Sequence, residues 1–93
     1  MKEIKNSVWV FHGANARFSS GVFSSLDKAA EWIKKNRLSG ILTEYQIDES
    51  PYDWAISNNF FEPKRLEQTE AGFIQKFTSA SQEHYHFENG DFD

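Results

Sequence analysis

The stretch "VWVFHG", residues 8–13, predicts the strand around which the rest of the fold is arranged. Its first four residues are all apolar. Because side chains alternate between the two faces of a strand, Val8 and Val10 share one side while Trp9 and Phe11 share the other. Apolar residues on both sides are typical of a strand that is covered on both faces. We therefore expect a central strand here.

The segments that follow predict a β-hairpin and then a helix. "ANARFSSG", residues 14–21, is rich in small and polar turn residues, and "GVFSS", residues 21–25, is extended again. "SSLDKAAEWIKKNR", residues 24–37, predicts a helix that Ser24 caps and Asp27 supports three residues later. Asn36 tolerates the left-handed conformation that ends helices. Apolar residues recur with helical spacing at Leu26, Ala29, Ala30 and Ile33.

The second half of the chain predicts two strands separated by two helices. "SGILTEYQID", residues 39–48, alternates Ile41, Thr43, Tyr45 and Ile47 against the residues between them, which indicates a strand with one solvent-exposed face. "SPYDWAISNN", residues 50–59, predicts a short helix with Ser50 as cap and Pro51 in the first position. "TEAGFIQKFTSA", residues 69–80, predicts a third helix with Phe73, Ile74 and Phe77 on one side.

The last segment, "EHYHFE" at residues 83–88, predicts a strand. Tyr85 and Phe87 would point one way, and His84, His86 and Glu88 the other. The order β-β-α-β-α-α-β predicts an α+β protein: one two-layer domain over residues 1–93. We expect a mainly antiparallel sheet of about four strands with two or three helices on one face, and frayed ends at residues 1–6 and 90–93.

Composition excludes several classes of function. The 93 residues include no cysteine, which excludes disulfides, thiolate zinc sites and cysteine nucleophiles. No apolar run is long enough to span a bilayer, and the net charge of -4 disfavours binding to phosphate backbones. We expect a cytoplasmic protein that binds neither membrane nor nucleic acid, needs no cofactor, and can accept a basic protein partner.

The histidines near the C-terminus raise the alternative of a small metal-dependent or acid-base enzyme. On a strand, His84 and His86 would share a face with Glu88, and His12 would join them if the first and last strands paired. The chain lacks a nucleophile elbow and a phosphate-binding loop. A non-catalytic role is therefore the leading prediction. Only the enzyme alternative gives His84, His86, Glu88 and His12 a catalytic or metal-binding role.

Aromatic residues beside carboxylates favour a protein-binding surface instead. Trp, Tyr and Arg are the residue types enriched at binding hot spots. Carboxylates at residues 48, 49, 53, 83 and 88 would surround such aromatics and attract a basic partner. The residues that we predict to bind this partner are Arg17, Tyr52, Asp53, Trp54, Glu83 and Tyr85.

Several segments together resemble a family of small bacterial proteins that is known as a domain of unknown function. They are "VWVFHG", "FSSGVFSSLDKAAEWI", "LSGILTEYQIDES", "YDWAI" and "FTSASQEHYHFENG". The chain is also loosely similar to small immunity-type proteins, which neutralise bacterial toxins. The family resemblance names no activity. The non-catalytic binding role is predicted from the small size, the acidic charge, the lack of a catalytic constellation and the aromatics beside carboxylates, and the looser resemblance adds the hypothesis of an immunity-type protein. A structural or homodimer-forming module is a further alternative, because an antiparallel sheet can offer an edge or face to a second copy.

Overall fold

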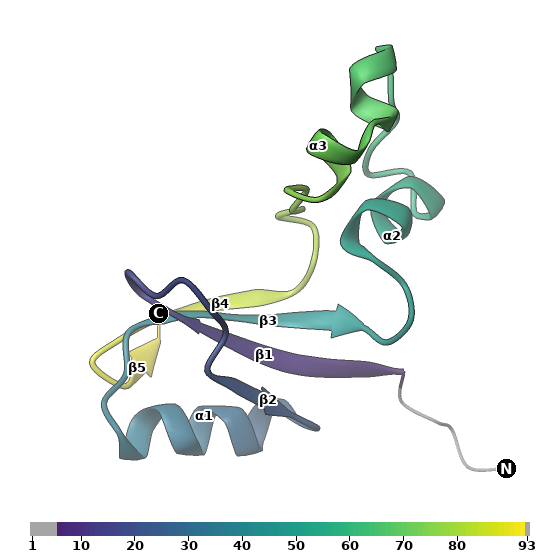
Figure 1. Cartoon of the computed structure of the whole chain (residues 1–93). Coiled ribbons are helices and arrows are strands. Elements are labelled where there is room, and N and C mark those ends of the chain that lie inside the picture. Colours follow the sequence, from purple (N-terminus) through teal and green to yellow (C-terminus); the bar gives the residue numbers. More distant parts are fainter. Residues whose placement is uncertain (1–5, 93) are drawn as a thin grey trace, which may run out of the picture.

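The computed structural model of the chain describes residues 6–92 and shows an open, antiparallel sheet of five strands in the order β2-β1-β3-β4-β5 (Figure 1). Of the ends expected to be frayed, residues 1–6 and 90–93, residues 1–5 and 93 lie outside this range. The elements are β1 Ser7–Gly13, β2 Gly21–Phe23, α1 Leu26–Lys35, β3 Gly40–Gln46, α2 Pro51–Ser57, the 3-10 helix η1 Leu66–Thr69, α3 Ala71–Ile74, β4 His84–Glu88 and β5 Asp91–Phe92.

The arrangement confirms the α+β class and the mainly antiparallel sheet. β1 pairs with β2 on one side and with β3 on the other, as the apolar run at residues 8–13 predicted. β3 then pairs with β4. The sheet has five strands rather than about four, because the chain turns back after β4 and adds β5.

The turn between β4 and β5 explains this fifth strand. Asn89 and Gly90 both have positive φ angles, 53° and 92°, which the two-residue loop of a tight hairpin requires. The Gly90 N–H donates to the carbonyl oxygen of Leu38 at 2.9 Å. The hairpin is thus fixed against the segment that follows α1, where the sequence had suggested a frayed end.

Both ends of α1 differ by one residue from the prediction. The cap is Ser25 rather than Ser24, and its side chain accepts a hydrogen bond from the backbone N–H of Lys28 at 3.2 Å. At the other end Arg37, with φ 55°, takes the left-handed position expected of Asn36. Leu38 N–H then donates to the carbonyl oxygen of Ile33 at 3.0 Å, so the helix ends in a Schellman motif.

Helix α1 covers one face of the sheet and forms the main core with it. The buried residues of this core are Trp9, Phe11, Ala29, Ile33, Leu42 and Phe87. The ring of Trp32 packs edge-on against Phe11 at a centroid distance of 5.9 Å. Among the helices within residues 6–92, α1 alone supplies residues to this cluster. Of the two or three helices predicted on one face, α1 alone lies there among the described residues, because the others pack around an aromatic cluster of their own.

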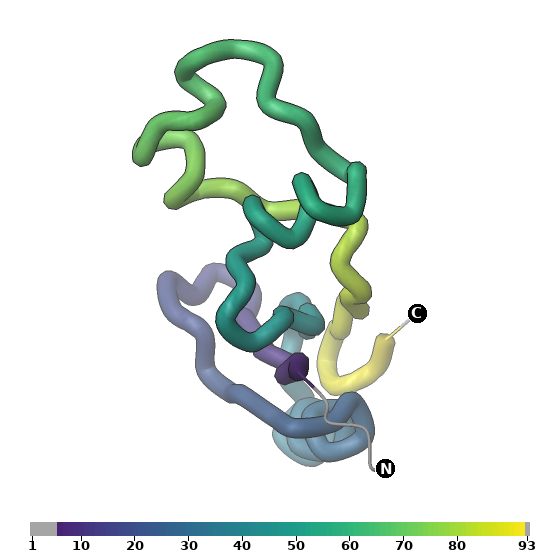
Figure 2. The backbone as a smooth tube through the Cα atoms, turned by 90° about the vertical axis from the view of Figure 1, so that its right-hand side faces the viewer, coloured from purple at the N-terminus to yellow at the C-terminus, as the bar shows by residue number. Residues whose placement is uncertain are grey.

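The remaining helices form a helical lobe, residues 51–77, that projects beyond the end of β3 on the side away from α1 (Figures 1 and 2). Ser50 caps α2 as predicted, because its hydroxyl accepts from the N–H of Asp53. The third helix, predicted within residues 69–80, is shorter than expected: α3 ends at Ile74, and the extended Glu70 separates it from η1. The lobe has its own aromatic cluster of Tyr52, Phe61, Phe73 and Phe77, with ring centroids 4.9 to 6.3 Å apart.

The sheet face opposite α1 has no helix packed flat against it, and we call it the open face. Its residues alternate in sequence with those of the core. Leu42 of β3 is paired with Phe11 of β1 and is fully buried under α1, whereas the neighbouring Ile41 points to the other side and is 41% exposed. The open face consists of Val8, Val10, His12, Val22, Ile41, Thr43, Tyr45, His84 and His86.

Candidate functional site

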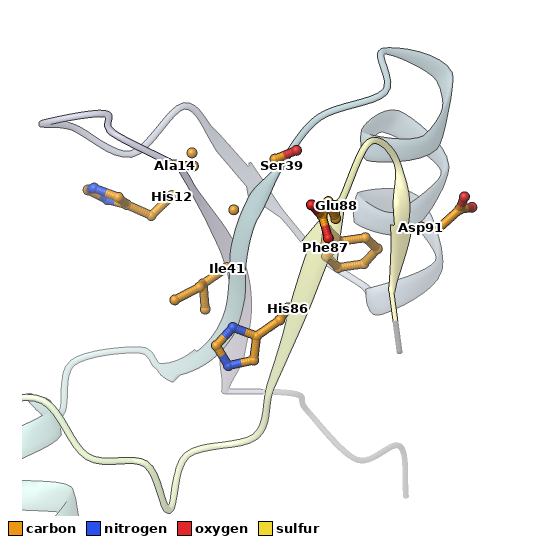
Figure 3. Close-up of a pocket in the computed structure, with 10 residues that line it drawn as sticks. His12, Ala14, Ser39, Ile41, His86, Phe87, Glu88 and Asp91 are labelled. Carbon is orange, nitrogen blue, oxygen red and sulfur yellow. The ribbon is translucent and has the colours of Figure 1, made fainter.

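A groove runs along the open face. It consists of two adjoining hollows of about 440 and 400 Å³, which share His12, Ile41 and His86. Figure 3 shows these three side chains projecting from neighbouring strands, while Phe87 of the same strand as His86 points toward α1. One hollow continues toward Ser39 and Glu88 and the other toward Tyr45 and the segment at residues 78–82. The groove is therefore walled by the loop after β1 and by the chain returning from the helical lobe.

Strand register explains why these residues meet. In the antiparallel pairs His12 lies opposite Ile41, and Ile41 lies opposite His86, so the three form one row across β1, β3 and β4. Thr43 stands between Val10 and His84 in the next row in the same way. All three histidines of the chain are thus on one face, although they are far apart in sequence.

Two of the histidines are fixed by backbone carbonyl groups. His12 Nε2 lies 2.7 Å from the carbonyl oxygen of Ala16, and His84 Nδ1 lies 2.8 Å from that of Gln82. Because a carbonyl oxygen only accepts, each of these nitrogens carries the proton and donates it. The His84 and His86 rings are 5.4 Å apart between centroids.

The predicted metal alternative grouped His84, His86 and Glu88, with His12 beside them. Within residues 6–92 no three histidines or carboxylates are placed so that they could hold a metal ion together. His12 and His86 are separated by the intervening Ile41. The geometry brings imidazoles to one surface, where they can donate and accept hydrogen bonds, without converging them on a point.

Apolar side chains are unusually exposed around the groove. Val22 of the edge strand β2 is 65% exposed, and Phe18 in the loop between β1 and β2 is 76% exposed. Val22 is paired with Val10 of the open face, and Phe18 directly precedes Ser19, which lines the groove. Exposed apolar residues that gather on one surface mark binding sites more often than residues scattered singly.

Charge is segregated along the chain. Between Arg37 and Lys64, and again after Lys76, there is no lysine or arginine, although both segments contain several carboxylates. These segments include β3, β4 and β5, which are neighbours in the sheet. Over residues 6–92 the structure has one salt bridge, between exposed side chains of Arg65 and Glu67 at 3.7 Å. Within residues 6–92 no lysine or arginine is paired with a carboxylate of β3, β4 or β5, and of these carboxylates Glu88 and Asp91 are exposed.

Glu83 and Tyr85 are the two predicted partner-binding residues that the structure brings into contact. The Tyr85 hydroxyl donates to Glu83 Oε2 at 3.4 Å, and its ring lies 6.0 Å from that of Trp9 on the α1 side of the sheet. Burial, followed by the negative charges of Glu83 and Glu44, raises the pKa of Tyr85 above its ordinary value of 10.0. These residues lie on the opposite face of β4 from His84 and His86.

The other predicted partner-binding residues lie elsewhere. Tyr52 is buried in the lobe, where its hydroxyl donates to the carbonyl oxygen of Gln68 at 2.8 Å. Asp53 is exposed at the start of α2, and Trp54 is half-buried beside Phe60 at a centroid distance of 5.4 Å. Arg17 is exposed in the loop after β1. The six residues thus lie in three places rather than in one patch.

Sequence reasoning missed Ile41, Val22 and Phe18 as surface residues. All three are apolar, and sequence alone favours burial for such residues. A signal was present for Ile41, because alternation had already placed it on the same face as Thr43 and Tyr45. Alternation does not show which of the two faces of the strand is covered by a helix.

Comparison with known proteins gives a family and no activity. The longest described helix, α1, has ten residues, and over residues 6–92 none is long and apolar enough to cross a membrane. No curated protein matches the chain, and neither does any solved structure. A family model described as "Domain of unknown function (DUF7710)" matches residues 8–93, which is nearly the whole chain. The chain therefore belongs to the DUF7710 family.

Proposed function

We propose that the protein is a non-catalytic binding module that docks a basic protein partner on the open face of its sheet. The observation that carries the proposal is the unequal covering of the two faces. One face is sealed by α1, and the other presents a groove with Ile41 at its centre. A sheet face with exposed apolar residues gains free energy when a partner removes them from water.

The charge of the partner follows from the surroundings of the groove. Glu88 and Asp91 line the groove as exposed carboxylates. Glu44 lies on the α1 face of β3, where it accepts a hydrogen bond from Ser7, and the five strands contain no lysine or arginine. Complementary charge speeds the encounter of two proteins and selects among partners more than it adds to affinity. A partner with lysine and arginine around an apolar contact would match this surface.

A more specific form of the proposal is that the protein is a bacterial, cytoplasmic immunity-type protein that neutralises a toxin. Support comes from the small size, the net charge of -4 and the loose similarity of the segments "GVFSS" and "LTEY", with the helix between them, to such proteins. A toxin domain that acts on nucleic acid is commonly basic, because it must bind phosphate groups. It would then meet the acidic side of this sheet.

The test is co-purification followed by measured affinity. The tagged chain is used to recover partners from the native host, and any partner, including the product of the adjacent gene, is then purified and titrated. Ile41→Glu should weaken the complex at least about tenfold, which corresponds to ~1.4 kcal/mol. Phe60→Glu, on the exposed surface of the helical lobe, is the matched control and should leave the dissociation constant unchanged.

Two results would overturn parts of the proposal. Recovery of no macromolecular partner would remove the binding function. A complex that resists Ile41→Glu and is broken by Phe60→Glu or Trp54→Ala would keep a binding function and place it on the helical lobe. Unfolding of each variant in urea must show that its midpoint is unchanged, so that lost binding is not lost folding.

A further inference from the structure

We propose that the occupant of the open face is an amphipathic helix of the partner, apolar on one side and flanked by lysine and arginine. This inference rests on the proposed function and makes the partner specific. The helix would lie over β1, β3 and β4, parallel to the long direction of β3, on the side of the sheet opposite α1. The binding of the partner would then convert a two-layer fold into a three-layer one.

The backbone chemistry of a sheet face favours a helix over an extended segment. The N–H and C=O groups of β3 lie in the plane of the sheet and are used by β1 and β4. An extended segment lying on the face would find no backbone partners there. A helix satisfies its own backbone groups and only needs to bury a side-chain stripe. α1 shows that this sheet accepts a helix, since Ala29 and Ile33 are completely buried against its other face.

The side chains of the open face match such a stripe. Val10, Ile41 and Tyr45 line the groove on adjacent strands, and none of the three carries a formal charge at neutral pH. Thr43 lies between them on β3. Apolar residues of a helix at positions i, i+3, i+4 and i+7 form a stripe of this kind. Ile41 is the central contact, because it belongs to both hollows of the groove.

Carboxylates are placed at both ends of this apolar region. Glu88 lines the groove beyond His86 and is exposed. At the opposite end, Asp48 and Glu49 lie two and three residues beyond the last residue of β3, in the turn that leads to α2, where Glu49 accepts a hydrogen bond from Ser57. No lysine or arginine occurs in any of the five strands. A docked helix with basic residues near both of its ends would therefore meet opposite charge at each.

The length of the groove sets the length of the helix. The seven residues of β3 span roughly 24 Å at about 3.4 Å per residue. A helix of about 16 residues has the same length at about 1.5 Å per residue. About four turns would suffice to contact both ends of the open face.

The inference can be tested with a defined probe before the natural partner is known. The probe is a capped 16-residue peptide of leucine and lysine (about four turns), with leucine at helical spacing. Two control peptides have the same leucine and lysine residues in scrambled order, or glutamate in place of lysine. The uniformly ¹⁵N-labelled and methyl-labelled full chain is titrated with each peptide. The ordered basic peptide should shift Ile41 and Tyr45 signals and leave those of Ala29 and Ile33 in place.

Variants sharpen the test. Ile41→Glu should weaken binding of the ordered peptide at least tenfold, and Glu88→Lys should weaken it by a smaller factor that shrinks as salt is added. Phe60→Glu should not change it. Equal binding of the ordered and scrambled peptides, or signal changes confined to the helical lobe or to α1, would overturn the inference.

The failure of this inference is distinguishable from that of the proposed function. If a recovered protein partner is displaced by Ile41→Glu while the ordered peptide does not bind, the open face is a docking site for something other than a helix. If the free chain sediments as a dimer and Ile41→Glu makes it monomeric, the occupant is a second copy of the chain. Either result overturns the helical partner, and the first leaves the proposed function standing.

Discussion

The two faces of the sheet are made from the same strands, yet they differ sharply in how they are covered. The contrast is clearest at two adjacent residues of β3: Leu42 is 0% exposed, and Ile41 is 41% exposed. Both are branched aliphatic residues of equal size, so intrinsic hydrophobicity does not separate them. The difference arises from α1, which packs on one face alone.

The residues around these two positions differ in kind as well. Around Leu42, the core contains aromatic rings in direct contact, including Phe11 and Trp32. Around Ile41, the neighbours in the same row are two histidines. One face therefore stabilises the fold. The other consists of residues that tolerate solvent in the free protein and can still contact a partner. Variants on either face should therefore differ in their effect on stability.

The largest effect is expected from truncating Leu42. Leu42→Ala removes a fully buried side chain and leaves a cavity, so it should lower the free energy of unfolding by about 3 kcal/mol. Ile41→Ala, one residue away on the open face, should lower it by less than about 1 kcal/mol. Urea unfolding followed by tryptophan fluorescence measures both. Equal losses would show that the two faces contribute alike to stability.

The next largest effect is expected at the hairpin that closes the α1 side. Gly90→Ala should cost about 2 kcal/mol, because φ is 92° and the new Cβ would lie 3.2 Å from the Cα atoms of Lys34 and Arg37. Gly72→Ala is the matched control, since nothing lies within 4 Å of a Cβ placed there and the residue is helical. That control should be neutral or slightly stabilising. A neutral Gly90→Ala would mean that the hairpin is not fixed to α1.

A smaller effect is expected from the cap of α1. Ser25→Ala removes the acceptor of the Lys28 N–H and should lower the free energy of unfolding by about 1 kcal/mol. Ser24→Ala should change it by less than about 0.5 kcal/mol, because its exposed side chain is not the cap. Thermal or urea unfolding of the pair decides which serine begins the helix. The reverse ranking would restore the assignment made from sequence.

The smallest effect concerns Tyr85, which lies on the covered side of β4. Its pKa in the folded protein is raised above 10.0, so the stabilisation linked to its proton is complete below pH 10 and is lost as pH rises through the folded value. Absorbance of tyrosinate against pH should therefore show one tyrosine that titrates late. Glu83→Gln removes a negative charge and should move that step toward lower pH. An unchanged step would mean that Glu83 does not contribute to the raised pKa of Tyr85.

Local signals in the sequence predicted most of the elements. The helical spacing from Leu26 to Ile33 and the Ser50–Pro51 start of α2 are short-range features that the structure confirms. The Asn89–Gly90 pair also carries a hairpin signal, but the acidic segment around it was interpreted as a frayed end, whereas the structure forms β5 there. The third helix was overestimated, since apolar spacing at Phe73 and Phe77 also fits a cluster of rings around Tyr52.

The candidate site was less predictable for a physical reason. Alternation in β3 correctly grouped Ile41 with Thr43 and Tyr45, but it gives no preference for which group faces a helix. That choice depends on pairing with β1, which aligns Leu42 with Phe11. Nor could sequence show that His12 and His86 lie in one row, because this requires the register of three strands. Non-local register is set by the whole fold.

The most direct test of the docking surface uses Ile41 and Leu42 as neighbouring reporters. The methyl groups of both residues are labelled in the full chain, and their NMR signals are followed while a recovered protein partner is added. We expect the Ile41 signal to shift or broaden and to receive cross-saturation from the partner, while Leu42, buried beneath α1, receives none. Cross-saturation at α1 or the helical lobe, with Ile41 unaffected, would contradict the assignment of the open face as the binding surface.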